Sequence, residues 1–160
     1  MPARRGSARY SIRQAFDAPV DFVFRWCTDY TPEDPRLGKE VKERRILERS
    51  EGKVVYEDLE PTPGGWHWSR VDVTLHPPNR WTARIRGNHR DWRLEYTLRS
   101  LPGNRSELLW TGVRRPALLG TENPSRRSLE REMHQLWGNY ARVLERDYRR
   151  KDRRGSPRRR

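Results

Sequence analysis

Residues 124–148 of this chain, PSRRSLEREMHQLWGNYARVLERDY, form its longest stretch with a helical repeat. Large apolar residues recur there at steps of three and four, which places them on one face of an α-helix. Asn123 and Pro124 provide a start signal, because an Asn side chain caps a helix and the φ angle of proline suits its first turn. The apolar face consists of Leu129, Met133, Leu136, Trp137, Tyr140, Val143, Leu144 and Tyr148.

Seven segments before this helix alternate between apolar and polar residues, as is typical of β-strands. The alternation is clear in 91–101, where Trp92, Leu94, Tyr96 and Leu98 are separated by polar or charged residues. Short turns between the later strands require antiparallel neighbours, and an apolar sheet face needs a cover. We therefore expect the sheet to wrap around the long helix. The predicted strands are 10–16, 42–49, 53–60, 66–76, 80–86, 91–101 and 106–115.

The segment after the first strand predicts one or two short helices. Asp17-Ala18-Pro19 is a start signal for the first of them, because proline is favoured in the first helical turn. Residues 30–38 contain two prolines and indicate a loop or one short helical turn. The fold class is therefore α+β, with about seven antiparallel strands and a long C-terminal helix.

The composition of the 160 residues predicts one domain with a basic segment at each end. Charged residues make up 36% of the chain, and the formal net charge is +13. Residues 1–8 and 151–160 are basic and offer few apolar side chains, so we expect two disordered tails around a single domain at 9–150. The tails could make weak, sequence-independent contact with nucleic acid, although a basic tail is also typical of a merely solubilising segment.

Cysteine usage and hydropathy indicate in which cellular compartment the protein is expected. The single cysteine, Cys27, excludes an intramolecular disulfide and is typical of a reducing compartment. A small buried side chain is favoured over a nucleophile, because no His and Asn or Asp context surrounds it. The sequence shows neither an apolar run that could span a membrane nor a signal-peptide pattern, and we expect a cytoplasmic protein.

Two short motifs occur in the sequence, one directly after the first predicted strand and one in and after the last. The first strand runs into DAPVDFVF (17–24), and LWTGV (109–113) is followed by LLG (118–120) before the long helix. Over about residues 8–150 the chain thereby resembles the START-type helix-grip superfamily (SRPBCC-like), which includes bacterial polyketide cyclase/dehydrase and lipid-transport proteins. The resemblance implies a curved sheet around the C-terminal helix and, between them, a cavity for a lipid, a polyketide or another hydrophobic compound. It implies no particular catalytic residue.

A ring-rich set of side chains is predicted to line this cavity and to contact a hydrophobic or aromatic ligand. The alternative is a plain packed core, in which the rings only fill space. Binding, with transport as one form of it, is the leading hypothesis. The predicted ligand contacts are Tyr56, Ser69, Trp81, Trp92, Tyr96, Trp110, Met133, Trp137 and Tyr140.

An enzyme of the cyclase or dehydratase type is the second hypothesis, and the residues leave open whether the protein is an enzyme. Asp58, His67 and Tyr96 are its candidates for acid and base catalysis. For Asp58 an exposed ion pair is the favoured alternative, and His67 could equally lie wet at a strand end. The four histidines are too dispersed for a metal signature, His89 is expected in a solvent-exposed turn, and no cofactor is predicted.

An interaction module is the third hypothesis. Trp66 and Trp68 lie on the strand face opposite Val71 and Val73, so we expect them on the outer surface. Exposed tryptophans are typical of a surface that binds a partner, which here could be a second copy in a homodimer or another protein.

Overall fold

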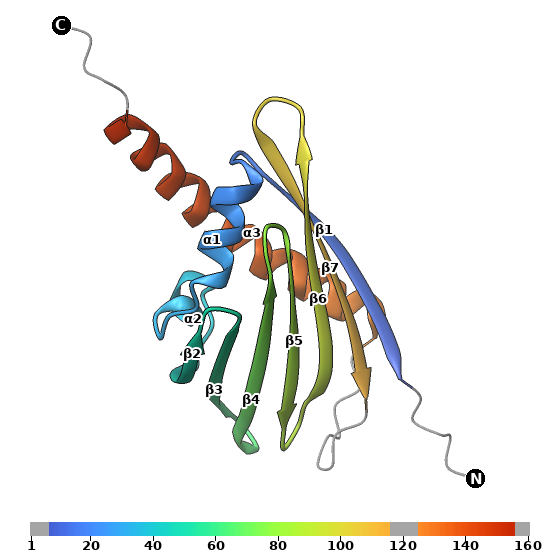
Figure 1. The fold of residues 1–160 in the computed structure, drawn as a ribbon. Coiled ribbons are helices and arrows are strands. Elements are labelled where there is room, and N and C mark those ends of the chain that lie inside the picture. The colour runs from blue at the N-terminus through green and yellow to red at the C-terminus, as the bar shows by residue number, and fades with distance from the viewer. Residues whose placement is uncertain (1–6, 116–124, 156–160) are drawn as a thin grey trace, which may run out of the picture.

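The computed structural model describes residues 7–115 and 125–155. Seven antiparallel strands form one curved sheet in the order β1-β7-β6-β5-β4-β3-β2, and the long helix α3 crosses its concave face (Figure 1). The predicted helix-grip architecture is thus confirmed, including two short helices after the first strand. The strands are β1 (Ala8–Phe16), β2 (Glu43–Ser50), β3 (Lys53–Thr62), β4 (Gly65–His76), β5 (Arg80–Gly87), β6 (Asp91–Leu101) and β7 (Arg105–Arg115). The helices are α1 (Val20–Thr28), α2 (Asp34–Leu37) and α3 (Arg126–Gly155).

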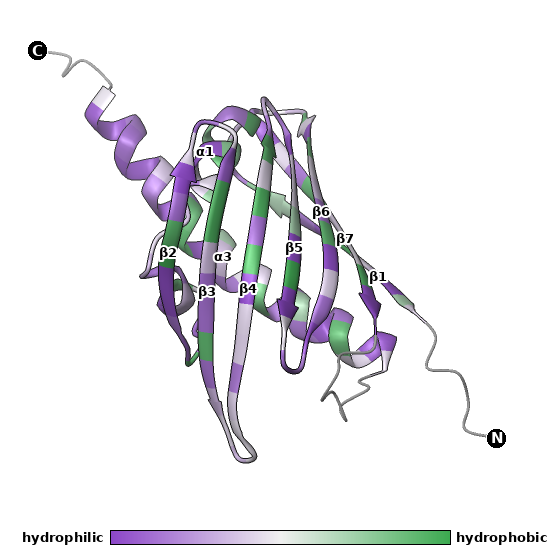
Figure 2. Ribbon diagram, turned by 60° about the horizontal axis from the view of Figure 1, so that its bottom comes forward, coloured by the Kyte–Doolittle hydropathy of each residue, from purple (hydrophilic) through white to green (hydrophobic). Residues whose placement is uncertain are grey.

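Hydrophobic and hydrophilic residues follow one another along the strands (Figure 2). In β6, Trp92, Leu94 and Tyr96 are buried, whereas Arg93 and Glu95 between them are exposed. Successive strand side chains point to opposite faces, so an apolar residue at every second position gives one continuous apolar surface. This surface faces α3 and forms the core.

β1 forms one edge of the sheet, and β2 forms the opposite edge. β1 pairs with β7 along its whole length, from Ala8 opposite Arg114 to Phe16 opposite Ser106. β2 pairs only with β3, at the other edge. The chain between them, with α1 and α2, therefore passes from one edge of the sheet to the other. This crossing brings α2 into contact with α3 and β2.

The long helix starts and ends later than the sequence predicts. Its first turn is capped by Ser125, whose Oγ accepts a hydrogen bond of 3.1 Å from the backbone N–H of Ser128. The motif at 118–120 and the proposed start signal at Asn123 and Pro124 lie outside the described residues. At the other end α3 continues to Gly155, so residues 151–155, which we assigned to a disordered tail, are helical. Residues 149–154 contain no Gly or Pro to stop the helix.

Two surface observations complete the fold. Trp66 and Trp68 are 57% and 43% exposed on β4, which confirms their predicted position outside the core. Neither α3 nor any other helix among the described residues combines the length and the apolar character that crossing a membrane requires.

Candidate functional site: a cavity between the sheet and the long helix

A cavity of about 250 Å³ lies between the concave face of the sheet and α3. The nine residues predicted as ligand contacts all line it, and so do Asp58 and His67. Their contact with a ligand stays a prediction. The volume of the cavity is slightly below the range of about 300–1,000 Å³ that is usual for small-molecule pockets.

Stacked rings form the floor of the cavity. The ring of Tyr96 on β6 lies parallel to that of Trp81 on β5, with centroids 4.7 Å apart and an angle of 6° between the planes. Phe24 of α1 meets Trp81 edge-on at 5.8 Å. From α3, Trp137 lies 6.0 Å from Tyr96 and 5.4 Å from Tyr140. Paired rings of this kind hold one another in place, so the cavity has a rigid aromatic surface.

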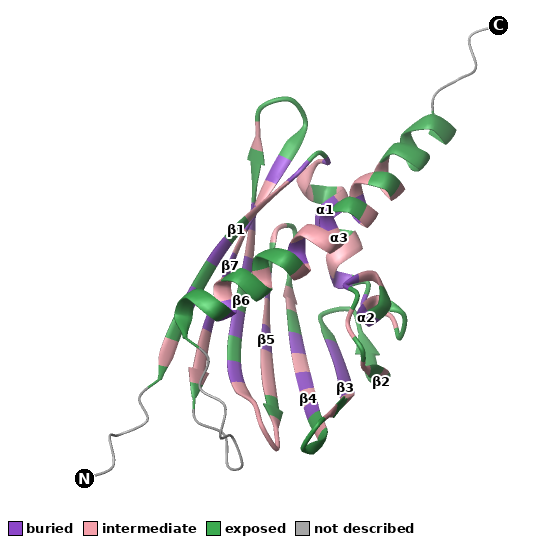
Figure 3. Ribbon diagram, turned by 180° about the vertical axis from the view of Figure 1, so that it is seen from behind, coloured by how far each residue is buried: buried purple, intermediate pink, exposed green. Residues whose placement is uncertain are grey.

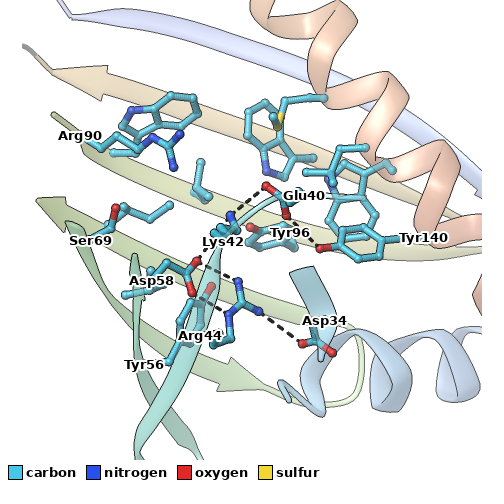
Figure 4. A pocket seen from close by; sticks show the side chains of 18 of the residues that line it. Asp34, Glu40, Lys42, Arg44, Tyr56, Asp58, Ser69, Arg90, Tyr96 and Tyr140 are labelled. Carbon is cyan, nitrogen blue, oxygen red and sulfur yellow. Dashed lines mark hydrogen bonds and ion pairs between the residues drawn. The ribbon is translucent and has the colours of Figure 1, made fainter. Parts of the chain in front are cut away.

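The opposite wall is charged and is built around Arg44 of β2 (Figure 4). Its Nε donates to Asp58 Oδ1 at 2.8 Å, and a terminal nitrogen donates to Asp58 Oδ2 at 3.0 Å. A further contact of 3.4 Å reaches Asp34 of α2. The guanidinium also lies 4.0 Å from the centre of the Tyr56 ring, a cation–π contact. The Arg44 side chain is only 6% exposed, so these neighbours, rather than water, compensate its charge.

The charged wall continues from Asp58 toward α3. Lys42 lies 3.5 Å from Asp58 and 2.8 Å from Glu40, and the Tyr140 hydroxyl donates to Glu40 at 3.4 Å. Asp58 is thus ion-paired, as we expected, but the expectation that it is exposed is wrong, because it is 6% exposed. Arg44 of the edge strand β2 and Lys42, just before this strand, both point inward and compensate the buried carboxylate.

A pair of histidines lies at another part of the cavity wall. His67 of β4 and His89, in the turn between β5 and β6, stack with ring centroids 3.9 Å apart. His89 lies in a turn, as predicted, but it is half-buried and lines the cavity rather than being fully exposed. The cause is the close approach of this turn to β4: Asn88 beside it hydrogen-bonds to the backbone of Trp66 and Trp68.

Two buried indoles of the lining lack a hydrogen-bond partner. Among the described residues, nothing accepts a hydrogen bond from Nε1 of Trp81 or from Nε1 of Trp92. The two side chains are 1% and 8% exposed. An unpaired buried N–H is costly, and a buried Trp usually finds an acceptor for it. The two indoles are therefore donors that a bound molecule could satisfy.

Proton chemistry in the cavity is limited by burial. Burial raises the pKa of the Cys27 thiol, so it stays protonated and is a poor nucleophile. Burial likewise raises the pKa of the Tyr96 phenol, against a lowering by a hydrogen bond from Trp110. Tyr96 therefore stays protonated and can donate a hydrogen bond, but the raised pKa makes it a weak acid and leaves no phenolate to act as a base. Within residues 7–115 and 125–155, no cluster of His, Cys, Asp and Glu could hold a metal ion.

Alkaline titration should report this burial. Desolvation, the largest effect, raises the pKa of Tyr30, Tyr56, Tyr96 and Tyr140 above the usual value of about 10. The folded state thus holds these protons more tightly than the unfolded chain, so this contribution to stability is complete below pH about 10 and is lost as the pH rises through the folded values. We expect their phenolate absorbance to appear together with unfolding. Ionisation of all tyrosines near pH 10 in a protein that remains folded by circular dichroism would contradict the buried geometry.

Comparison with known proteins gives structural matches only. No protein-family model and no curated protein sequence matches this chain. The Zhui aromatase/cyclase from a Streptomyces species superposes with a TM-score of 0.73 at 15% identity, over 88% of this chain and 95% of that one. The di-domain aromatase/cyclase StfQ of the steffimycin biosynthetic pathway gives 0.66 at 17% identity, over 89% of this chain and 46% of that one. Ara h 8.0201 superposes with a TM-score of 0.66 at 11% identity, over 87% of this chain and 98% of that one.

Matches at such low identity establish the architecture and leave the chemistry to the residues. The matches extend over 87–89% of this chain, so they cover nearly the whole of the sheet and helices described above. This chain therefore has the helix-grip fold.

Proposed function

We propose that this protein binds a hydrophobic, aromatic small molecule that carries oxygen acceptors, in the cavity between the sheet and α3. The observation that carries the proposal is the pair of unpartnered indole donors, Trp81 and Trp92, in an aromatic cavity. Burying rings against rings supplies the affinity, since apolar burial contributes about 25 cal/mol per Å². Hydrogen bonds to the two indoles then orient the ligand.

The charged wall suits recognition of a polar edge on the same ligand. Asp34, Glu40, Asp58, Lys42 and Arg44 are held by one another, so they present fixed dipoles rather than free charges. A flat molecule with rings against Trp81 and Tyr96 and oxygens at its rim matches both walls. Two of the similar structures are aromatase/cyclases by their names, which supports a ligand of aromatic character.

A matched pair of probes tests this proposal. Acetonaphthone has a carbonyl acceptor, and ethylnaphthalene has the same ring system without one. Trp81→Phe and Trp92→Phe replace the indole by a smaller aromatic ring without the N–H, so each should weaken acetonaphthone binding, relative to that of ethylnaphthalene, by about 2- to 10-fold, the contribution of one neutral hydrogen bond. Ethylnaphthalene binding should hardly change. Calorimetry or quenching of tryptophan fluorescence measures both.

Trp66→Phe is the control, because Trp66 is exposed on the other face of the sheet. It should alter the binding of neither probe. The proposal fails if wild-type protein binds neither naphthalene and if the protein purified from its own host shows no co-purifying small molecule in native mass spectrometry.

A second candidate function is a cyclase or dehydratase reaction in the same cavity. It is favoured by the protonated phenol of Tyr96, which lines the cavity and can polarise a substrate carbonyl by donating a hydrogen bond to it. Asp58 is a poorer candidate, because Arg44 and Lys42 occupy its carboxylate oxygens. Tyr96→Phe separates the two functions: it should abolish turnover of an aromatic polyketide substrate while leaving acetonaphthone binding nearly intact.

A further inference from the structure

The last two turns of α3 project beyond the body of the protein. Figure 3 shows this end of the helix leaving the sheet behind, with an exposed surface all round. Residues 149–155 are all exposed, and they read RRKDRRG. The last large side chain that packs is Tyr148, which meets Phe22 of α1 with ring centroids 5.0 Å apart. The basic segment is therefore a free helical rod and not part of the core.

The arginines of this region gather on one side of the helix. At about 100° per residue, six of them fall within an arc of about 140°. They span twelve steps of the helix, or about 18 Å along its axis. We call them the arginine face: Arg142, Arg146, Arg149, Arg150, Arg153 and Arg154.

The arginine face points away from the protein. Trp137, Leu144 and Tyr148 lie on the opposite side of the helical wheel, where α3 meets the sheet and α1. Lys151 also falls on that side, with its Nζ 5.7 Å from the centre of the Phe22 ring. The division is thus complete: one side of the helix packs, and the other presents arginine to solvent.

Most of this charge has no counter-charge. Arg146 reaches Asp147 at 3.5 Å, and Arg142 donates to the side-chain oxygen of Asn139. Arg149, Arg150, Arg153 and Arg154 form no ion pair within the part of the chain that the structure describes. Arginines at i, i+3 and i+4 repel one another, which destabilises a helix by a few tenths of a kcal/mol per pair. An external polyanion would relieve this repulsion.

We propose that the arginine face binds the phosphate backbone of duplex nucleic acid, independently of base sequence. Arginine binds phosphate with two parallel hydrogen bonds, and successive turns of the helix repeat the guanidinium at about 5.4 Å. An α-helix with its side chains is about 10–12 Å in diameter, which matches the width of the major groove of B-form DNA, about 12 Å. The segment is free of the body at its end, so it can enter a groove without a clash.

The composition of the rod favours nucleic acid over a membrane. A helix that inserts into a lipid interface needs an apolar face opposite its cations. The last large apolar side chain, Tyr148, is already engaged with Phe22 and with Asn104, and residues 149–155 contain none. Charge attraction to phosphate is the interaction that this surface offers, and a duplex provides phosphates at high density.

The experiment measures binding of the full-length protein to a short fluorescent DNA duplex by anisotropy, over a series of salt concentrations. The test variant carries Arg149→Gln, Arg150→Gln, Arg153→Gln and Arg154→Gln, since Gln keeps the helix propensity. Each phosphate contact contributes about 0.9 to the slope of log affinity against log salt, so the variant should lower the slope by about 3–4 and weaken binding at low salt by about 10-fold or more. Two duplexes of unrelated sequence should bind alike.

A control variant removes the same charge from the outer face of the sheet: Arg45→Gln, Arg80→Gln, Arg93→Gln and Arg99→Gln. These four arginines are exposed, and their loss should leave the slope unchanged. Equal losses in both variants would mean that net charge alone attracts the duplex, and would overturn the proposal. So would a wild type that ignores the duplex but binds vesicles containing phosphatidylserine through the same four arginines. Circular dichroism verifies that each variant is folded.

Discussion

Asp58→Ala should lower the free energy of unfolding by about 3–5 kcal/mol, the usual result of removing one partner from a buried ion pair. Asp58 is the hub of the charged wall, with Arg44 and Lys42 both within 3.5 Å. Those two side chains are 6% and 9% exposed, so bulk water is a poor substitute for the lost carboxylate. Arg44 would keep only its 3.4 Å contact to Asp34, and its two hydrogen bonds to Asp58 would be lost inside the protein. Urea unfolding followed by tryptophan fluorescence measures the change.

Asp72→Ala provides the matched control on the outer face of the same sheet. Asp72 also pairs with two arginines, Arg70 at 3.5 Å and Arg86 at 3.2 Å, but these are 43% and 61% exposed. Water and salt screen such pairs, and we expect a loss of about 1 kcal/mol or less. If both substitutions cost the same, the charged wall is solvated and Asp58 is no more buried than Asp72.

Trp137→Ala should cost about 3–5 kcal/mol, as is usual for truncation of a buried tryptophan. Trp137 is 8% exposed and is the side chain of α3 that lies over the ring of Tyr96. Its removal takes away ring contacts to Tyr96 and Tyr140 and extends the cavity toward the helix. Affinity for a small apolar probe such as ethylnaphthalene should therefore fall as well, because the ligand loses one wall.

His134→Ala is the control on the same helix. His134 is exposed, so its truncation should change stability by less than about 0.5 kcal/mol and leave probe binding as in wild type. Trp137→Ala with wild-type stability and wild-type probe binding would place Trp137 on the surface. That result would contradict the packing of α3 over the sheet.

The tests of the aromatic cavity depend on residues that sequence periodicity had already identified. Alternation predicted that Trp81, Trp92 and Tyr96 lie on the apolar faces of their strands, and the resemblance implied a cavity beside them and Trp110; all four line the cavity. Alternation is reliable here because the geometry of a strand repeats every two residues regardless of its neighbours. The same rule placed Trp66 and Trp68 outside.

The charged wall was not predicted, and its residues show why. Arg44 belongs to the edge strand β2 and Lys42 directly precedes it, in a segment where basic, acidic and apolar residues follow no clear alternation. β2 also changes register between Ile46 and Glu48. Asp34 and Glu40 lie in and just after α2, a helix of four residues without a periodic signal. A positively charged residue near the start of a strand is far more often exposed than buried. The residue types of Lys42 and Arg44 therefore indicated exposed side chains, whereas the structure buries them.

Sequence alone established the class of fold, the order of its elements and the inward face of the later strands, because helical and strand periods are local properties of the chain. The three-dimensional structure was needed for whatever depends on approach between distant segments. Arg44 meets Asp58 through pairing of β2 with β3, and His89 meets His67 because the turn between β5 and β6 approaches β4. The free energy of these contacts comes from burial and charge compensation across space, which no local pattern records.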